Sequence, residues 1–355
     1  MRKNKNKKTV LVGMSGGLDS SVAAYLLDKR GFEVLGVYLK MNTRRKDESF
    51  KKAKEVAALL KIQFMSENIS TFFKRRIIDD FIKKYSENLT PNPCVLCNSE
   101  IKFKFLNKIA QGKKMDFIAT GHYARLKKDG KGFFYLLKGK DNKKDQSYFL
   151  YRLKQNILKK TIFPLGEFTK EQTREIFEKS ILGNLELEKD SQDVCFFANR
   201  EKLNHFLERN IKKTKKGRII DEEGSFLGFH NGLEFYTKGQ RQKLGLSGGP
   251  YFVVGKNTRE GELIVSKNKD SHRLFNAQII LEKTNWLSRR PQIGKNYYFK
   301  IRSGAKPARG VLKMENGYWT VFLSRSQWGV ASGQSVVAYD GQKVIGGGII
   351  KKTVN

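Results

Sequence analysis

The stretch Thr9-Val10-Leu11-Val12-Gly13-Met14, followed directly by Ser15-Gly16-Gly17-Leu18-Asp19-Ser20-Ser21, decides the fold of the first part of the chain. The apolar run predicts a buried strand, and the amphipathic run 22–29, closed by Gly31, predicts a helix. Glycines at the turn between them allow φ > 0 and a close approach of the backbone to a ligand. Such a turn directs backbone N–H groups and the positive end of a helix dipole at one place. The stretch therefore predicts a phosphate site, with Ser15, Ser20 and Ser21 as further hydroxyl donors.

Apolar runs alternate with longer amphipathic stretches up to about residue 200. The predicted strands are 33–39, 62–65 and 116–120, and the predicted helices are 49–60, 72–85 and 101–110. This alternation predicts an α/β domain with a Rossmann-like, doubly wound parallel sheet. Ligands of such sheets bind beyond the carboxyl ends of the strands, which is where the glycine turn would lie.

Beyond about residue 210 the chain changes to short β-type runs separated by turn dipeptides. Asn316-Gly317 and Asp340-Gly341 each lie between two such runs, and both predict hairpins. We therefore expect three parts: the α/β domain at 1–205, a small β-rich central domain at 206–278 and a C-terminal β-barrel at 279–355.

The chain is strongly basic. Its 355 residues include 70 Lys and Arg against 35 Asp and Glu, a formal net charge of +35 at pH 7. An AT-rich genome or a polyanionic partner would each produce such an excess, and the resulting field attracts polyphosphates. Only three cysteines are present, which excludes a disulfide scaffold and indicates a reducing, cytoplasmic setting. No apolar run approaches the ~20 residues needed to cross a bilayer, so we expect no membrane partner.

The glycine turn is neither a Walker A loop nor a dinucleotide fingerprint, because no Gly-Lys-Ser/Thr and no Gly-x-Gly-x-x-Gly is present in it. It resembles the PP-loop of ATP pyrophosphatases. That resemblance implies that the turn holds the pyrophosphate of ATP while AMP is transferred to a substrate oxygen. Asp19 would then help to hold the Mg²⁺ that accompanies ATP.

Two further segments carry the cysteines: Thr90-Pro91-Asn92-Pro93-Cys94-Val95-Leu96-Cys97-Asn98 and Asp190-Ser191-Gln192-Asp193-Val194-Cys195-Phe196-Phe197. The two prolines predict a stiff loop before a helix, whose N-terminus would lower the pKa of the thiols. Three interpretations remain open: half of a zinc site, inert core residues, or a pair of thiols that handles sulfur by disulfide exchange.

Over nearly its whole length the chain resembles the tRNA-specific 2-thiouridylases, the MnmA family. The matching segments are 13–21, 90–103, 119–123, 144–150, 163–166, 191–196, 237–241 and 333–334. The resemblance implies an ATP-dependent transfer of sulfur to carbon 2 of the wobble uridine in tRNA of the Lys, Glu and Gln type. It also implies a sulfur donor, either a cysteine desulfurase or a sulfur-relay protein.

The same resemblance assigns roles to residues. Cys195 would carry a persulfide, and Cys97 would be the nucleophile that releases its sulfur and leaves a Cys97–Cys195 disulfide. The implied ATP contacts are Gly13, Met14, Ser15, Gly16, Gly17, Leu18, Asp19, Ser20, Leu39 and Gly121. The implied tRNA contacts are Asn92, Pro93, Cys94, His122, Asp145, Gln146, Ser147, Arg302, Ser303 and Gln334, with no metal ligand among them.

Two positions depart from the family pattern. Many relatives have Asp in place of Cys94, as a proposed general base, so the base is left unassigned here. Ser332 stands where relatives usually have proline, one residue before Gly333-Gln334. Two alternative functions stay open: another PP-loop enzyme that adenylates a different substrate, and a basic RNA-binding protein without catalysis.

Overall fold

The computed structural model describes residues 7–41, 48–186, 194–197, 202–287 and 290–354. The chain forms two compact units, which we describe separately. The first consists of residues 1–78, 93–198 and 341–345, and the second of residues 79–92, 199–340 and 346–355. Within the described ranges, no helix is long and apolar enough to span a membrane.

A five-stranded sheet organises the first unit, with the order β3-β2-β1-β4-β7 and every pair parallel. Its strands are β1 (Thr9–Gly13), β2 (Glu33–Lys40), β3 (Gln63–Asn68), β4 (Phe117–Ala119) and β7 (Thr161–Ile162). Val10, Leu11 and Val12 are fully buried, as expected for a strand covered on both faces. The predicted Rossmann-like sheet is confirmed, and its predicted strands lie within a few residues of their observed positions.

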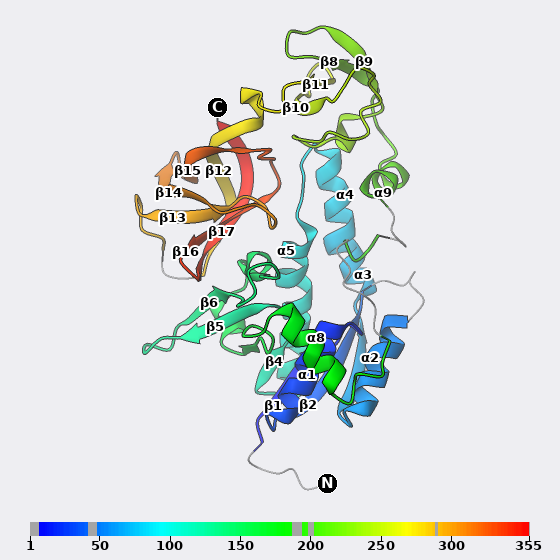
Figure 1. Cartoon of the computed structure of the whole chain (residues 1–355), viewed down its shortest axis with the longest axis vertical. Coiled ribbons are helices and arrows are strands. Elements are labelled where there is room, and N and C mark those ends of the chain that lie inside the picture. The colour runs from blue at the N-terminus through cyan, green and yellow to red at the C-terminus, as the bar shows by residue number, and fades with distance from the viewer. Residues whose placement is uncertain (1–6, 42–47, 187–193, 198–201, 288–289, 355) are drawn as a thin grey trace. The chain divides into compact units, whose positions relative to one another are not determined.

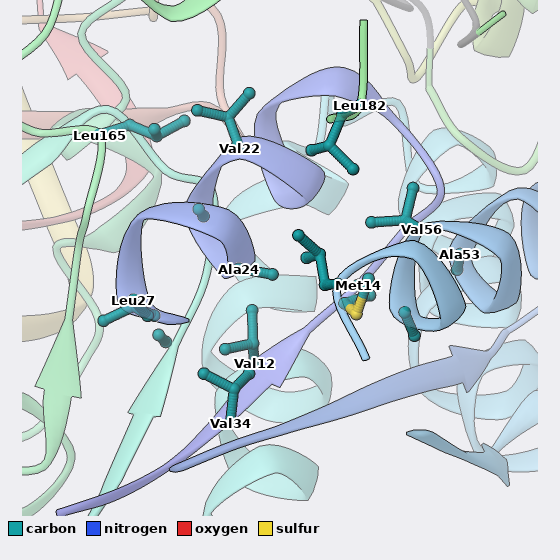
Figure 2. Packing of buried hydrophobic residues seen from close by; sticks show 14 of the residues in the cluster. Val12, Met14, Val22, Ala24, Leu27, Val34, Ala53, Val56, Leu165 and Leu182 are labelled. Carbon is teal, nitrogen blue, oxygen red and sulfur yellow. The ribbon is translucent and has the colours of Figure 1, made fainter. Parts of the chain in front are cut away.

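Helices join and cover these strands: α1 (Leu18–Lys29), α2 (Glu48–Leu59), α3 (Ser70–Phe73), α5 (Pro93–Cys97), α6 (Phe103–Gly112), α7 (Gln155–Leu158), α8 (Lys170–Lys179) and the 3₁₀ turn η3 (Ser147–Leu150). Apolar residues of α1, including Val22 and Leu27, pack with Val12 of β1 and Val56 of α2 (Figure 2). This core fixes the start of α1, and hence the glycine turn, against the sheet.

The predicted helices 72–85 and 101–110 contain a feature that the sequence pattern did not predict. Each is continuous with a wider π-helical turn, η1 (Lys74–Ile78) and η2 (Asn98–Lys102). After η1 the chain enters α4 (Asp79–Ser86) of the second unit. The first unit also contains the hairpin β5 (Ala124–Lys128) and β6 (Phe134–Lys138).

The second unit contains two β structures, drawn from green to red in Figure 1. The first is a four-stranded sheet of β8 (Gly217–Ile220), β9 (Phe226–His230), β10 (Phe252–Asn257) and β11 (Glu262–Ser266), in the order β10-β11-β8-β9. Close to it in sequence are α9 (Leu203–Asn210) and the 3₁₀ turns η4 (Leu233–Phe235) and η5 (His272–Leu274).

The second β structure is the predicted barrel. It is built from β12 (Phe275–Trp286), β13 (Asn296–Lys300), β14 (Ala308–Glu315), β15 (Tyr318–Trp328), β16 (Ser335–Asp340) and β17 (Lys343–Val354). β12 pairs with both β15 and β17, which closes the barrel (Figure 1). Asn316 and Gly317 both have positive φ, the geometry of a tight hairpin turn, so the predicted hairpin of β14 and β15 is confirmed. The second predicted hairpin, β16 and β17, is also confirmed.

Candidate active site

The glycine turn leads from the end of β1 into the first turn of α1. Gly16 has a φ of +79°, and a Cβ at this position would collide with the carbonyl oxygen of Ser49. Gly17 is the N-cap of α1, and no side chain caps the helix there. The first backbone N–H groups of α1 are therefore left for an anion at the positive end of the helix dipole.

Serines hold the turn together from inside. The backbone N–H of Ser15 donates to Oγ of Ser20 at 3.1 Å, and the two hydroxyl oxygens also lie 3.1 Å apart. Ser20 and Ser21 both donate their hydroxyl protons to the carbonyl oxygen of Gly17, at 2.9 and 3.0 Å. Because Ser21 is fully buried, the expectation that its hydroxyl reaches an anion is wrong. The serines shape the turn, and the backbone supplies most of its donors.

Three other residues expected at the nucleotide, Gly121, Met14 and Leu39, lie in or just after strands of the sheet. A Cβ on Gly121, just after β4, would lie 2.7 Å from the carbonyl carbon of Asp19. The absence of a side chain at Gly121 therefore allows the glycine turn to pack closely against the end of β4. The Met14 side chain is buried in the core, and its backbone N–H donates to Val37 at 2.9 Å. Leu39 is half-buried near the end of β2.

Asp19 is held by two buried side chains that the sequence reasoning missed. Its Oδ1 accepts a hydrogen bond from the Tyr123 hydroxyl at 2.8 Å and one from Lys170 Nζ at 2.7 Å. Lys170 is only 2 % exposed and lies 5.9 Å from the centre of the Tyr123 ring. It begins α8, which is fixed by a capping box between Thr169 and Gln172. Neither contact had a local signal, because Tyr123 and Lys170 lie 104 and 151 residues from Asp19.

These contacts decide how the turn fits ATP and Mg²⁺. The close approach at Gly16 and Gly121 and the uncapped N–H groups suit a phosphate chain. Oδ1 of Asp19 is already taken by two donors, so only Oδ2 is left to meet a cation. Among the described residues, no cluster of three or more His, Cys, Asp or Glu side chains is arranged to hold a metal.

The cysteine segment begins as a short helix. Pro93 is the first residue of α5. Proline is favoured at this position because a backbone N–H there would have no partner within the helix. Cys94 follows it and is exposed, whereas Cys97 ends α5 and is 5 % exposed. Cys195 lies in the same unit and is exposed, and all three thiols are reduced. Residues 190–193 of the second cysteine segment lie outside the described residues.

The expectation that the helix N-terminus lowers the pKa of these thiols is wrong. Burial raises the pKa of Cys97 to about 12, and the nearby charge of Lys102 offsets this only in part. Protein atoms crowd the Cys94 sulfur although its side chain reaches solvent, and the loss of water raises its pKa as well. α5 continues without a break into η2 and α6, so both thiols lie in the first turns of a longer helical run, but the loss of water around their sulfurs outweighs the helix dipole.

Lys102, the last residue of η2, is the shared neighbour of these sulfurs. Burial by itself would lower the pKa of Lys102, but charge interactions with Cys97, Cys195 and Cys94 raise it above its ordinary value. The ammonium group therefore keeps its charge in this half-buried place. Lys102 lies in the segment that matches the family, but α-helical spacing gave no sign that it faces the cysteines.

His122 borders the same region. Its Nδ1 lies 2.7 Å from Oγ1 of Thr120, and its ring packs against the rings of Phe103 and Phe163. Burial, followed by the charge of Lys102, lowers the pKa of His122 to about 3. His122 is thus neutral near pH 7, and a contact with tRNA through it would be that of an uncharged imidazole.

The expected tRNA contacts at 145–147 form a tight turn. Oδ1 of Asp145 accepts from the backbone N–H groups of Gly139 and Ser147, at 3.1 and 3.0 Å. Oε1 of Gln146 accepts from the Tyr123 backbone at 3.0 Å. Ser147 is fully buried. The turn ties the neighbourhood of Tyr123, and hence of Asp19, to the segment before η3.

Gln334 lies in the second unit, where it contacts the segment that leads to the cysteines. Its Nε2 donates to the carbonyl oxygen of Thr90 at 3.0 Å, and the Thr90 N–H donates to Ser332 at 2.8 Å. Gly333 has a φ of +91°, and a Cβ there would lie 2.9 Å from the Thr90 nitrogen. The Thr90 hydroxyl oxygen is also 3.2 Å from that of Thr237.

Arg302, Ser303 and Asn92 complete the expected tRNA contacts in this unit. Arg302 and Ser303 are exposed just after β13, and the Arg302 guanidinium lies 5.6 Å from the centre of a Trp328 ring. Asn92 is half-buried. A guanidinium held over an aromatic ring on an exposed surface suits contact with phosphate or with a base.

The parallel sheet and the strand–glycine turn–helix unit define a protein of the PP-loop class. The family described as tRNA methyl transferase HUP domain matches residues 8–199, the corresponding PRC-barrel domain matches 204–267, and the aminomethyltransferase beta-barrel domain matches 276–350. Full-length relatives are more specific. The tRNA-specific 2-thiouridylase MnmA of Clostridium botulinum is 38% identical over 98% of this chain and 99% of its own, and that of Methylobacillus flagellatus is 39% identical over 97% and 99%. The chain belongs to the tRNA-specific 2-thiouridylase family, as its sequence predicted.

Solved structures match part of this chain at low sequence identity and low TM-score. A 4-thiouridine synthetase in complex with RNA and ATP is 17% identical, with a TM-score of 0.34 over 49% of this chain and 41% of its own. An NH3-dependent NAD synthetase from Campylobacter jejuni is 21% identical, with a TM-score of 0.31 over 50% of this chain and 65% of its own.

Proposed function

We propose that this protein uses ATP to replace the carbon-2 oxygen of the tRNA wobble uridine by sulfur, in tRNA of the Lys, Glu and Gln type. One observation carries the proposal. The first unit holds a glycine turn suited to an anion. It also holds Cys97 and Cys195, which are far apart in the sequence and both interact with the charge of Lys102. The first feature suits activation of an oxygen with ATP, and the second suits sulfur transfer.

Activation is needed because a carbonyl oxygen is a poor leaving group. The uridine oxygen would attack the α-phosphate of ATP and release pyrophosphate, which leaves the oxygen as part of AMP. The backbone N–H groups at Gly17 and the first turn of α1 would stabilise the charge that develops on the pyrophosphate. Mg²⁺ bound with ATP would neutralise further phosphate charge, and Oδ2 of Asp19 would help to hold it.

Sulfur transfer would then use both cysteines. The terminal sulfur of a persulfide on Cys195 attacks carbon 2. The Cys97 thiolate attacks the Cys195 sulfur, the S–S bond of the persulfide breaks, and its electron pair stays on the sulfur bound to carbon 2. The carbon–oxygen bond breaks and AMP leaves, which forms the thiocarbonyl. The Cys97–Cys195 disulfide that remains needs two electrons from an external thiol before the next cycle.

Other parts of the proposal concern partners and position. A cysteine desulfurase or a sulfur-relay protein would transfer sulfur to Cys195 and so form its persulfide. The reaction would take place in the cytoplasm. Residues 206–278 and 279–355 would contact tRNA, and residues 1–205 would bind ATP and carry the catalysis. Cys94 is not supported as the general base, because its raised pKa keeps it protonated near pH 7. The target base would meet Asn92, Pro93 and Cys94. The remaining tRNA contacts would be His122, Asp145, Gln146, Ser147, Arg302, Ser303 and Gln334.

The test is to isolate tRNA for Lys, Glu and Gln from cells that lack this gene and from cells that regain it, and to determine the mass of the wobble nucleoside. We expect sulfur at carbon 2 only where the gene is present. Thiolation that is independent of the gene would reject the proposal. Activation of a different substrate oxygen by the purified protein and ATP would favour another PP-loop reaction.

The two cysteines can be tested separately. Cys97→Ser and Cys195→Ser should each abolish thiolation and leave tRNA binding in a filter assay unchanged, because neither change removes a positive charge. Cys94→Ser is the matched control, since it alters a neighbouring thiol on the same helix and should keep most of the activity. An equally inactive Cys94→Ser would show that Cys94 takes part in the chemistry.

A further inference from the structure

The π-helical turn η2 changes which residue lies on the same helix face as Cys97, one turn further along the chain. In an α-helix, Lys102 would lie five residues on and about 140° around the axis from Cys97, on a different face. Hydrogen bonds in a π-helix join residues five apart, so the wider turn stacks position 102 over position 97. Such turns are frequent at functional sites, because they cost backbone stability and persist where a side chain has to be redirected.

Among the described residues, Lys102 is the cation whose charge acts on both Cys94 and Cys97. His122, whose pKa the charge of Lys102 helps to lower, is neutral near pH 7. Glu100, on the same π-helical turn, lies 3.7 Å from Arg76 of η1, so its charge is balanced by a separate partner. The charge interactions recorded for Lys102 are with sulfur, at Cys97, Cys195 and Cys94.

We propose that Lys102 is the counter-ion of the sulfur-transfer site, a positioning residue that keeps negative charge on Cys195 and Cys97 in turn. In the reaction the charge begins on the persulfide of Cys195, and Cys97 must become a thiolate before it attacks. One ammonium group near both sulfurs lets each carry its charge without a new partner. The proton of Cys97 goes to solvent, and Lys102 stays protonated throughout.

This inference deepens the proposed function, but its first consequence does not depend on tRNA. Loss of the ammonium group should make the thiols less acidic, and only the thiolate form reacts with an alkylating reagent. The variant is Lys102→Met, which keeps an unbranched side chain one atom shorter and without charge, and Lys102→Arg should restore the charge. Lys104→Met is the matched control: Lys104 lies two residues away, is exposed and contacts the ring of Phe72 rather than a thiol.

The experiment measures the rate of iodoacetamide alkylation of the full-length protein from pH 7 to pH 10, with the modified cysteines located by mass spectrometry. Peptides from a Cys94→Ser background report Cys97 separately from Cys94. At pH 8 we expect Lys102→Met to slow alkylation of Cys195 and Cys97 about tenfold, the effect of a shift of one pKa unit. Lys102→Arg and Lys104→Met should react at the parent rate.

A second measurement separates this role from a purely structural one. A half-buried ammonium beside neutral thiols loses hydration without gaining a full ion pair, so Lys102→Met should leave the melting temperature unchanged or raise it. Equal alkylation rates in Lys102→Met and the parent would overturn the inference, as would an equal slowing by Lys104→Met. If Lys102→Met slows alkylation while the parent protein itself does not thiolate tRNA, the proposed reaction fails and the counter-ion role stands.

Discussion

The side chain of Lys170 donates a hydrogen bond to Oδ1 of Asp19 at 2.7 Å, from a position that is almost completely buried. Asp19 lies in the glycine turn, and Lys170 begins a helix 151 residues later in the chain. The pair joins the turn to α8. It also balances a carboxylate that would otherwise repel the phosphates of ATP.

We expect Lys170→Met to weaken ATP binding about tenfold, because Asp19 then loses its counter-charge and the turn loses an anchor. The free energy of unfolding should fall by about 2 kcal/mol, which is less than for a fully buried pair because Asp19 is 29 % exposed. Calorimetric titration with ATP and urea unfolding measure the two effects. Lys179→Met, which breaks the exposed pair with Glu175 on the same helix, should change neither by a measurable amount. Wild-type ATP affinity in folded Lys170→Met would contradict this role.

Gly121→Ala should impair the nucleotide site without touching a ligand directly. The added Cβ would lie 2.7 Å from backbone atoms of Asp19, which cannot move without displacing the glycine turn. We expect at least tenfold weaker ATP binding in the same titration. Gly112→Ala is the control, because a Cβ there meets nothing within 4 Å at the end of α6. Similar ATP affinities for the two variants would show that the turn tolerates displacement.

Gln334→Ala distinguishes two roles of this residue. If Gln334 acts by holding Thr90, loss of the 3.0 Å hydrogen bond should lower the free energy of unfolding by about 1 kcal/mol. If it contacts tRNA alone, unfolding should be unchanged and tRNA affinity reduced. We expect the first result in urea unfolding, since the bond is present without tRNA. Gln342→Ala, in an exposed turn of the chain, is the matched control and should match the parent protein.

His122 should make the folded state sensitive to acid. The pKa of His122 is about 3 in the folded protein and about 6.5 in an unfolded chain, so below pH 6.5 the unfolded state binds the extra proton. The free energy of unfolding therefore falls as the pH drops from 6.5 toward 3. Between pH 7 and pH 5, the free energy of unfolding of His122→Gln, measured by urea unfolding, should fall by about 2 kcal/mol less than that of the parent. His205→Gln changes an exposed histidine and should follow the parent curve. Identical slopes for all three proteins would mean that His122 is not protected from protonation.

Local features were read correctly from the sequence. The turn 15–21 needs glycines and a following helix, and a buried parallel strand needs a continuous apolar run such as 9–14, so both are visible within a dozen residues. The hairpin at Asn316-Gly317 has the same kind of local cause, a positive φ at both turn residues. Family resemblance then predicted the reaction class, because its motifs lie on these local elements.

Only the tertiary structure decided the environment of the functional groups. Position along the chain suggested acidic thiols at a helix N-terminus, but burial raises the pKa of Cys97, and burial depends on what the rest of the fold packs around it. The π-helical turn that changes the direction of Lys102 could not be predicted from the spacing of apolar residues in the sequence. Lys170 and Asp19 meet because α8 packs beside α1, not because of any pattern near either residue. The sequence by itself determined the phosphate turn, the sheet and the barrel, since these follow from short-range backbone preferences. The charges that surround the turn and the thiols are long-range contacts, and packing alone sets them.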